Sequence, residues 1–253
     1  MSIHFPILRT KRLTVQLKEL SMASSIALAK MPVHTEQATV TAFLKSAVED
    51  SGAFSDITSW TVAERNLAVC HYLSCVSDGG ANFSVGNGSY MDYLDGEKDI
   101  KTVDTLIDIG ELGGDHWSMR HLTGWAVEAI ERLDGDIPNV AGRLHWIIGA
   151  MAAQLVRKDE DCPAQFDDDW LLHRMNVIAA LGESDFIELS YLHHLGNEKL
   201  HHLFFIDFDD NGVLAHPCDK GSELPPARFC IRACLSGFAQ RMGGPSNEFS
   251  EQS

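Results

Sequence analysis

Four side chains of the kind that bind zinc occur close together near the C-terminal end of the sequence. They are His216, Cys218, Cys230 and Cys234, with the spacing H-x-C, eleven residues, and then C-x3-C. Thiolates and imidazoles are the ligands of structural zinc sites, although such sites usually carry C-x2-C pairs. Two cysteines four residues apart on a helix could share a metal, or they could form part of an apolar face. Zinc binding is one interpretation of this group, and core packing is the other.

The segment Asp207–Gly212 matches the opening of a calcium-binding EF-hand loop, with Asp207, Asp209 and Asn211 as candidate oxygen ligands. The twelfth position of such a loop requires a bidentate glutamate, but this position is Cys218. The incoming segment also has the pattern of a strand instead of a helix. Because Asn-Gly favours a two-residue hairpin turn, an acidic hairpin is the alternative to a calcium site.

Five histidines lie in the stretch 191–218, including the adjacent pairs 193–194 and 201–202. Neighbouring side chains on a strand point to opposite faces, so each pair offers at most one ring to a common site. A site made of two histidines and Asp207 is conceivable, and half-buried histidines bonded to the backbone are the alternative. The sequence contains no H-E-x-x-H, G-x-S-x-G, Walker or G-x-G-x-x-G motif, so we predict no catalytic residue and no cofactor.

A glycine-rich acidic loop from Gly110 to His116 is a third candidate site. It carries Glu111, Asp115 and His116 beside three glycines, and it could bind a small ligand. The same composition is typical of a flexible entry to a helix, and we favour that interpretation.

The C-terminal candidates depend on a predicted hairpin and a predicted final helix. Apolar residues over 200–208 indicate a buried strand, the turn follows at 209–212, and 213–216 forms the return strand. Pro225-Pro226 is predicted to open a helix with Phe229, Cys230 and Cys234 on one side.

Helices are predicted over most of the remaining chain. The clearest begins at Thr61, where Thr61 and Glu64 form a capping box. Helices are also expected after Ser21 and Thr35 and over 115–133, 144–156, 170–181 and 184–196, and short strands over 5–8 and 13–17. The predicted fold class is therefore α+β and mainly α-helical: a helical body with a short N-terminal strand pair and a C-terminal β-hairpin.

The bulk composition is that of a globular protein. With 253 residues and 45% hydrophobic content, we expect a single domain over 1–242, or two parts over 1–100 and 101–242, followed by a flexible tail over 243–253. The net charge of −16 argues against binding to nucleic acid. The sequence shows no signal peptide and no apolar run long enough to span a membrane, so we expect a cytoplasmic protein with reduced thiols.

Two segments together resemble a known family. The opening RLTVQLKELSMASSIALAKMP and the helix WTVAERNLAVCHYLSCV, followed by an acidic loop and YMDYL, are similar in layout to the tail-assembly and baseplate-hub proteins of tailed bacteriophages. The resemblance covers roughly the first hundred residues. It implies a non-enzymatic role in virion assembly and partners among the tail, tape-measure or baseplate-hub proteins. It also implies a location in the host cytoplasm during assembly, or in the virion. The alternative is a metal-dependent enzyme or a zinc-stabilised domain centred on His216, Cys218, Cys230 and Cys234.

Overall fold

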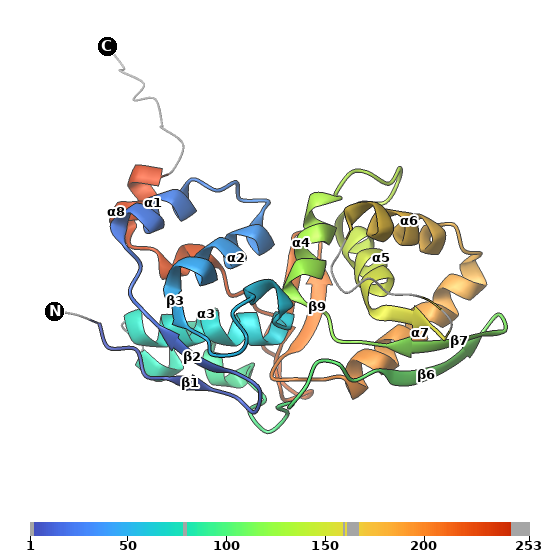
Figure 1. Cartoon of the computed structure of the whole chain (residues 1–253), viewed down its shortest axis with the longest axis horizontal. Coiled ribbons are helices and arrows are strands. Elements are labelled where there is room, and N and C mark those ends of the chain that lie inside the picture. Colours follow the sequence, from blue (N-terminus) through green and yellow to red (C-terminus); the bar gives the residue numbers. More distant parts are fainter. Residues whose placement is uncertain (1–2, 78–79, 159, 161–166, 244–253) are drawn as a thin grey trace, which may run out of the picture.

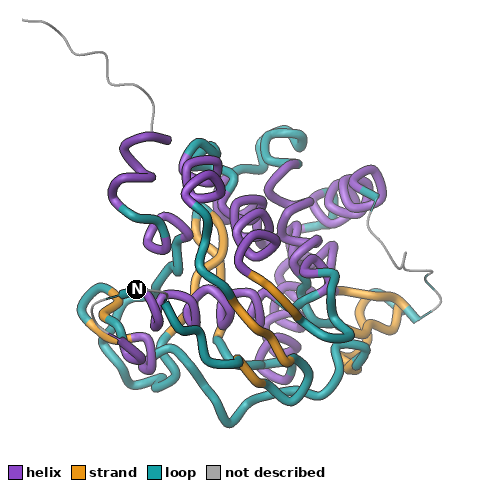
Figure 2. The backbone as a smooth tube through the Cα atoms, turned by 60° about the vertical axis from the view of Figure 1, so that its left-hand side comes forward, coloured by secondary structure: helices purple, strands orange, loops and turns teal. Residues whose placement is uncertain are grey.

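Helices and several small antiparallel sheets make up the computed structural model, which describes residues 3–77, 80–158, 160 and 167–243 (Figure 1). The predicted mixed, mainly helical character is confirmed. Figure 2 shows that the strands form separate small groups among the helices instead of one central sheet. The tail predicted over 243–253 lies, apart from Gly243, outside the described residues.

The N-terminal part contains three strands where the sequence predicted two. The strands and helices of this part are β1 (Leu8–Arg9), β2 (Thr14–Leu17), α1 (Met22–Ala29), α2 (Glu36–Ala47), β3 (Val48–Asp50) and α3 (Val62–Val76). Strand β3 follows α2 directly and pairs with β2, so the strand pair becomes a three-stranded sheet. The predicted caps are present: Ser21 accepts a hydrogen bond from the Ser24 amide, and Thr61 and Glu64 form the capping box of α3.

The middle of the chain forms a second sheet that the sequence analysis did not predict. Its strands are β6 (Ile107–Leu112), β7 (Asp115–Met119) and β8 (Leu155–Arg157), all antiparallel. The prediction of one helix over 115–133 is therefore wrong for its first part, because only α4 (Gly124–Arg132) is helical. Gly113 and Gly114 both have positive φ, the backbone conformation that a tight two-residue hairpin turn requires. The glycine-rich loop is thus the tip of a hairpin and not the entry to a helix.

Three further helices belong to this part of the chain: α5 (Gly142–Gln154), α6 (Asp168–Ala179) and α7 (Glu183–Lys199). Helix α7 packs on β6, and α6 packs on α5. Helix α5 is buried along most of its length, which fits its apolar composition. Asp167 caps α6. Helix α7 continues through Gly196, where the predicted helix ended; the absence of a Cβ at Gly196 lets the helix pack closely on Met119 and Ile109 of the sheet.

A C-terminal hairpin is present, as β9 (Phe205–Asp209) and β10 (Gly212–His216), but its first strand begins at Phe205 and not at the predicted residue 200. The helix predicted after Pro225-Pro226 is not present. Instead, Ala227 exchanges two backbone hydrogen bonds of 2.8 Å with Ala215, so the chain is extended there and Cys230 lies outside any helix. A short 3-10 turn, η4 (Ile231–Cys234), and α8 (Gly237–Gly243) follow. The remaining short segments are η1 (Ile57–Ser59), η2 (Gly80–Asn82), β4 (Ser84–Val85), β5 (Gly88–Ser89) and η3 (Tyr90–Asp92).

Two hydrophobic cores organise the molecule. The first contains α1 to α3 and the N-terminal sheet, and it is completed by residues after 200, among them Phe204, Phe229 and Ile231. The second lies between α4, α5, α6, α7 and the β6–β7–β8 sheet. The β9–β10 hairpin lies where the two groups meet, and α8 packs on α1 at the far side of the first group (Figure 1). In the described part of the chain, none of the helices has the length and hydropathy needed to cross a bilayer.

Candidate binding cleft

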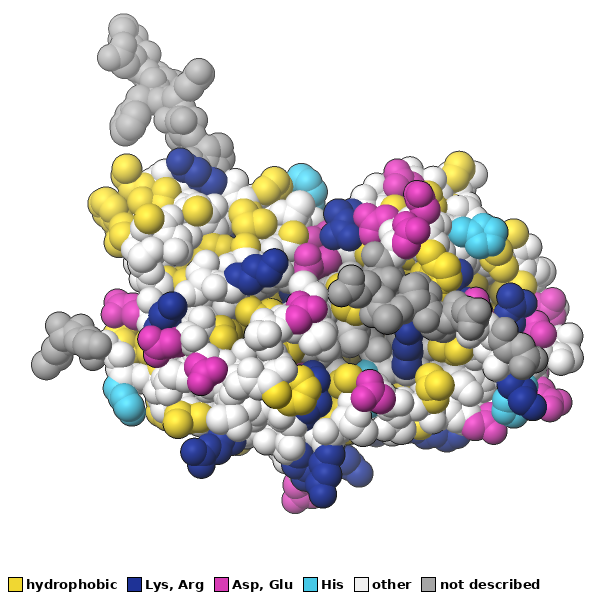
Figure 3. All heavy atoms as spheres, in the orientation of Figure 1, with side chains coloured by type: hydrophobic (Ala, Val, Ile, Leu, Met, Phe, Trp, Pro, Cys, Tyr) yellow, Lys and Arg dark blue, Asp and Glu magenta, His cyan; other side chains and the backbone are white. Residues whose placement is uncertain are grey.

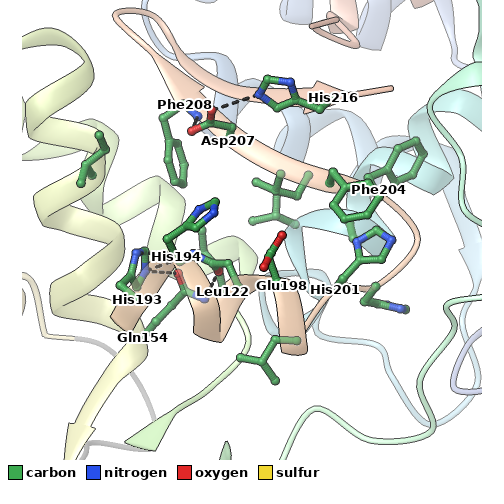
Figure 4. Close-up of a pocket in the computed structure, with 18 of the residues that line it drawn as sticks. Leu122, Gln154, His193, His194, Glu198, His201, Phe204, Asp207, Phe208 and His216 are labelled. Atoms are coloured by element: carbon green, nitrogen blue, oxygen red, sulfur yellow. Dashed lines mark hydrogen bonds and ion pairs between the residues drawn. The ribbon is translucent and has the colours of Figure 1, made fainter. Parts of the chain in front are cut away.

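A cavity of about 920 Å³ opens between α7, the β9–β10 hairpin and the N-terminal end of α3. Its volume lies in the range of ligand-binding pockets, which is about 300–1,000 Å³. The stretch 191–218, which the sequence analysis singled out for its histidines, supplies much of the lining. Figure 4 shows side chains from α7 and from the hairpin around the same space. Six histidines line it: His121, His193, His194, His201, His202 and His216.

One wall of the cleft is a stripe of side chains on α7. Ile187, Tyr191, His194 and Glu198 follow one another at intervals of four, three and four residues, so they lie along one face of the helix. Ile187 and Tyr191 are each 60% exposed although they are large and apolar. Ile187 and Tyr191 thus form an exposed apolar pair on the wall of the cavity, which a bound partner would cover.

His193 faces the inside of the molecule from the same helix. It is 6% exposed, and its Nε2 lies 3.0 Å from the Gln154 side-chain oxygen on α5. Because that oxygen can only accept, Nε2 is the donor and carries a hydrogen. Burial, together with the nearby His194, lowers the pKa of His193 to about 4. His193 is therefore neutral near pH 7 and holds α7 against α5.

The opposite wall carries a carboxylate–imidazole pair. His216 Nε2 lies 3.0 Å from Asp207 Oδ2, on neighbouring strands of the hairpin. Asp207 also accepts hydrogen bonds from Arg143 at 3.2 Å and from the Phe208 amide at 2.7 Å. Burial opposes ionisation of Asp207, but these bonds outweigh it and lower its pKa. The Asp207 carboxylate is thus fully engaged by its own neighbours.

The inner end of the cleft contains three more histidines. His201 bonds to Asp95 at 3.0 Å and stacks on Phe205 with 3.5 Å between ring centroids. His202 lies 3.3 Å from the Lys98 carbonyl, and its side chain is 2% exposed. The ring of His121 lies 6.1 Å from that of His202, and burial, followed by the charge of His202, lowers the pKa of His121 to about 4.

The predicted zinc ligands do not converge. His216 lines the cleft, and the Cys218 amide donates to the Asp92 carbonyl at 2.8 Å. Cys234 is buried in the first core, and Cys230 is half-buried near Glu36. Burial, followed by Asp95 and Asp92, raises the pKa of Cys218 to about 11, so it is a thiol at neutral pH. Across the described residues, no three His, Cys, Asp or Glu side chains are grouped as a metal site would require. Zinc binding stays a prediction for direct metal analysis.

The predicted calcium ligands are occupied by other protein groups. Asp207 binds His216 and Arg143, and Asp209 accepts hydrogen bonds from Arg228 and from the Asn211 amide at 2.8 Å. The turn itself is the hairpin that the alternative interpretation predicted, with Asp209 paired to Gly212. Calcium binding likewise stays a prediction.

The loop Gly110–His116 lies apart from the cleft, at the tip of the β6–β7 hairpin. His116 is near Asp108 at 3.3 Å and Glu111 at 3.7 Å, and all three side chains are substantially exposed. Neither His116 nor Asp115 contributes to the lining of the cleft. The cleft described above therefore gives no support to the hypothesis of a small-ligand site on this loop.

A second apolar surface lies elsewhere on the molecule. Hydrophobic side chains gather over α1 and α8, at the upper left of Figure 3. Met22, Phe238 and Met242 are 49%, 51% and 56% exposed, respectively. This surface lies outside the cleft lining. Its exposed side chains are apolar, without a charged or hydrogen-bonding group, so they do not indicate which class of ligand would bind there.

Three residues that line the cleft were not predicted from the sequence: His121, Gln154 and Ile187. For α7 the sequence pattern did contain a signal of the exposed apolar face. Leu189 is buried, and Ile187 and Tyr191 are apolar residues outside that buried face. Apolar side chains on the solvent-facing side of a helix can indicate a surface that contacts another molecule. For His121 and Gln154 no local pattern indicates their position.

Comparisons with known proteins identify no relative. No protein-family model, no curated protein and no solved structure matches the chain.

Proposed function

We propose that this chain is a non-enzymatic binding protein and that its cleft receives a segment of a partner protein. The observation that carries the proposal is the exposure of Ile187 and Tyr191, 60% each, on the wall of a cavity of about 920 Å³. Exposed aromatic and aliphatic side chains in a concave surface are typical anchors of protein–protein contacts.

The polar groups of the cleft support binding more than catalysis. A general base or nucleophile needs a free position next to the substrate. Here the Asp207 carboxylate is engaged by His216, Arg143 and the Phe208 amide, and His201 is bonded to Asp95. The pKa values of His121 and His193 are both lowered to about 4. An imidazole needs a pKa near 7 to accept and release protons at neutral pH, so neither histidine is suited to acid–base catalysis there.

The resemblance to phage tail-assembly and baseplate-hub proteins supplies the class of partner. We propose tail, tape-measure or baseplate-hub proteins, bound during assembly in the host cytoplasm or in the virion. The acidic surface, with a net charge of −16, favours protein over nucleic-acid partners.

Co-expression with candidate tail proteins tests the proposal. Ile187→Asp places a charge on the wall of the cleft, and Val177→Asp makes the same change at a residue of α6 that is 52% exposed and outside the cleft lining. We expect one tail protein to co-purify in a stoichiometric complex that Ile187→Asp abolishes and Val177→Asp preserves. A complex that survives Ile187→Asp unchanged, or no complex with any tail component, would reject the proposal.

A further inference from the structure

We infer that the segment bound by the cleft is basic and amphipathic, with an apolar centre and Lys or Arg side chains toward its ends. This inference rests on the proposed function, because it names the chemistry of the partner at the same site. Three features of the described residues support it: the order of side chains on α7, the pairing of the cations in the cleft, and the neutral histidines.

The first feature is the sequence of groups along the exposed face of α7. Ile187 and Tyr191 form its centre, Glu198 lies toward its C-terminal end, and Glu183 lies just outside the cleft lining toward its N-terminal end on the same face. The two glutamates are fifteen residues apart, which corresponds to roughly 22 Å along a helix. A complementary segment would therefore place apolar side chains at its centre and a positive charge near each end.

The second feature is that the cations of the cleft are already paired with carboxylates. Lys220 Nζ lies 2.8 Å from Glu198 Oε1, and Arg143 Nη2 lies 3.2 Å from Asp207 Oδ2. Asp219 also lines the cleft and, like Glu183, takes part in no ion pair within the described residues. The three carboxylates and two cations of the lining therefore sum to a net negative charge, which matches the acidic composition of the whole chain.

The third feature is that the inner histidines add little positive charge at neutral pH. His193 is held by its bond to Gln154, and burial keeps it neutral, as it does His121. The inner wall is thus polar but uncharged at these two positions. An acidic segment would meet Glu183 and Asp219 without compensation, whereas a basic segment gains from both and competes with the exposed Lys220 for Glu198.

Three fluorescent peptides of about 16 residues test the inference, since that length spans the α7 stripe as a helix. All three carry the same leucine and phenylalanine centre, and their ends are lysine, glutamine or glutamate. Binding is measured by fluorescence anisotropy to the full chain and to Ile187→Asp, Val177→Asp and Glu183→Gln. The Ile187 and Val177 variants change the net charge equally, so their comparison separates the cleft from general attraction to an acidic surface.

We expect the lysine peptide to bind at least about tenfold more tightly than the glutamine peptide, and the glutamate peptide to bind weakest. Ile187→Asp should weaken the lysine peptide by at least about tenfold, which is the loss typical of a central apolar anchor. Val177→Asp should leave its affinity unchanged. Glu183→Gln should reduce it by roughly two- to fivefold, as for one exposed charge pair, and less at high salt.

Two results would overturn the inference in distinguishable ways. If the three peptides bind equally and all depend on Ile187, the cleft is a docking site but does not select basic segments, so the proposed function survives alone. If no peptide shows dependence on Ile187, including the case in which the two aspartate variants behave alike, both the inference and the docking role of the cleft are wrong.

Discussion

Arg12 and Glu64 join the N-terminal strands to the beginning of α3 through a buried ion pair. Arg12 Nε donates to Glu64 Oε1 at 2.8 Å, and Glu64 is 1% exposed. The same carboxylate accepts from the Thr61 amide at 2.9 Å, which closes the capping box. One side chain therefore serves both the local start of the helix and a contact between residues 52 positions apart. It also lies next to Thr61 and Ala63, which line the cleft.

Replacing Glu64 by Gln should destabilise the fold strongly. The change leaves the buried Arg12 guanidinium without its counter-charge, and breaking a buried pair in this way costs about 3–5 kcal/mol. Urea unfolding followed by circular dichroism measures the loss. The matched control is Glu49→Gln, on the exposed strand β3, which should change stability by less than about 0.5 kcal/mol. Equal effects of the two changes would contradict the role assigned to Glu64.

The same pair predicts how stability falls in acid. Burial alone would raise the pKa of Glu64, but the hydrogen bonds and charge of Arg12, with His202 Nε2 3.9 Å away, outweigh it and lower the pKa from 4.5 to about 2. The stabilisation is therefore complete above about pH 4.5 and is lost as the pH falls from there toward 2. Unfolding free energies measured at several pH values should fall in this window for the native chain and fall less for Glu64→Gln. Parallel pH profiles would refute the prediction.

His193 predicts a second, higher window of acid sensitivity. Its pKa drops from 6.5 to about 4 in the folded protein, mainly through burial. The fold therefore favours the neutral imidazole, and stability decreases as the pH falls from 6.5 toward 4. His193→Gln keeps a donor for Gln154 but cannot be protonated, so its stability should depend less on pH in this window. His34→Gln, at an exposed position, should keep the native profile.

Gly149→Ala tests the close packing of α5 on α4. Alanine in a helix interior is favoured over glycine by about 1 kcal/mol. However, a Cβ at Gly149 would lie 2.7 Å from two carbons of Ile130, which is buried and branched. Overpacking costs typically 1–3 kcal/mol, so we expect a net loss of stability. Thermal unfolding should show a lower Tm, and adding Ile130→Val should recover part of it. A raised Tm for Gly149→Ala alone would show that α4 and α5 can move apart enough to accommodate the added methyl group at little cost.

Metal analysis of the purified and dialysed protein tests the zinc and calcium interpretations. Because His216, Cys218 and the Cys230–Cys234 pair lie in different surroundings, we expect much less than one zinc per chain. We expect the same for calcium, since Asp207 and Asp209 are bonded to arginines. Inductively coupled plasma mass spectrometry gives the metal content. About one zinc per chain that disappears in Cys218→Ser would revive the metal-dependent alternative.

Local signals predicted the elements that depend on neighbours in sequence. The capping box of Thr61 and Glu64, the cap at Ser21 and the Asn-Gly turn at Asn211 are all present where expected. Each is a contact within a few residues, so the sequence contains both partners side by side.

The errors arose where a distant segment decided the conformation. The segment 115–119 can be read as part of a helix, but it pairs with β6 and β8 on either side. The segment after Pro226 is extended because Ala227 bonds to Ala215 of the hairpin, and Tyr93 donates to the Pro225 carbonyl at 2.8 Å. In both cases tertiary hydrogen bonds outweigh the weak local preference for a helix.

The candidate site shows the same division. The sequence alone determined that histidines and acids are concentrated in 191–218, that this stretch contains a hairpin, and that the chain is acidic. Only the tertiary structure decided which of these side chains share a cleft, because the hairpin packs on α5 and α7 is joined to α5 by the His193–Gln154 hydrogen bond. It also decided that His193 is neutral and Asp207 is engaged, since burial and partners from other elements set both pKa values. Spacing along the chain specifies on which face of a helix or strand a side chain lies. Which residue lies opposite that face is decided by how the elements pack together.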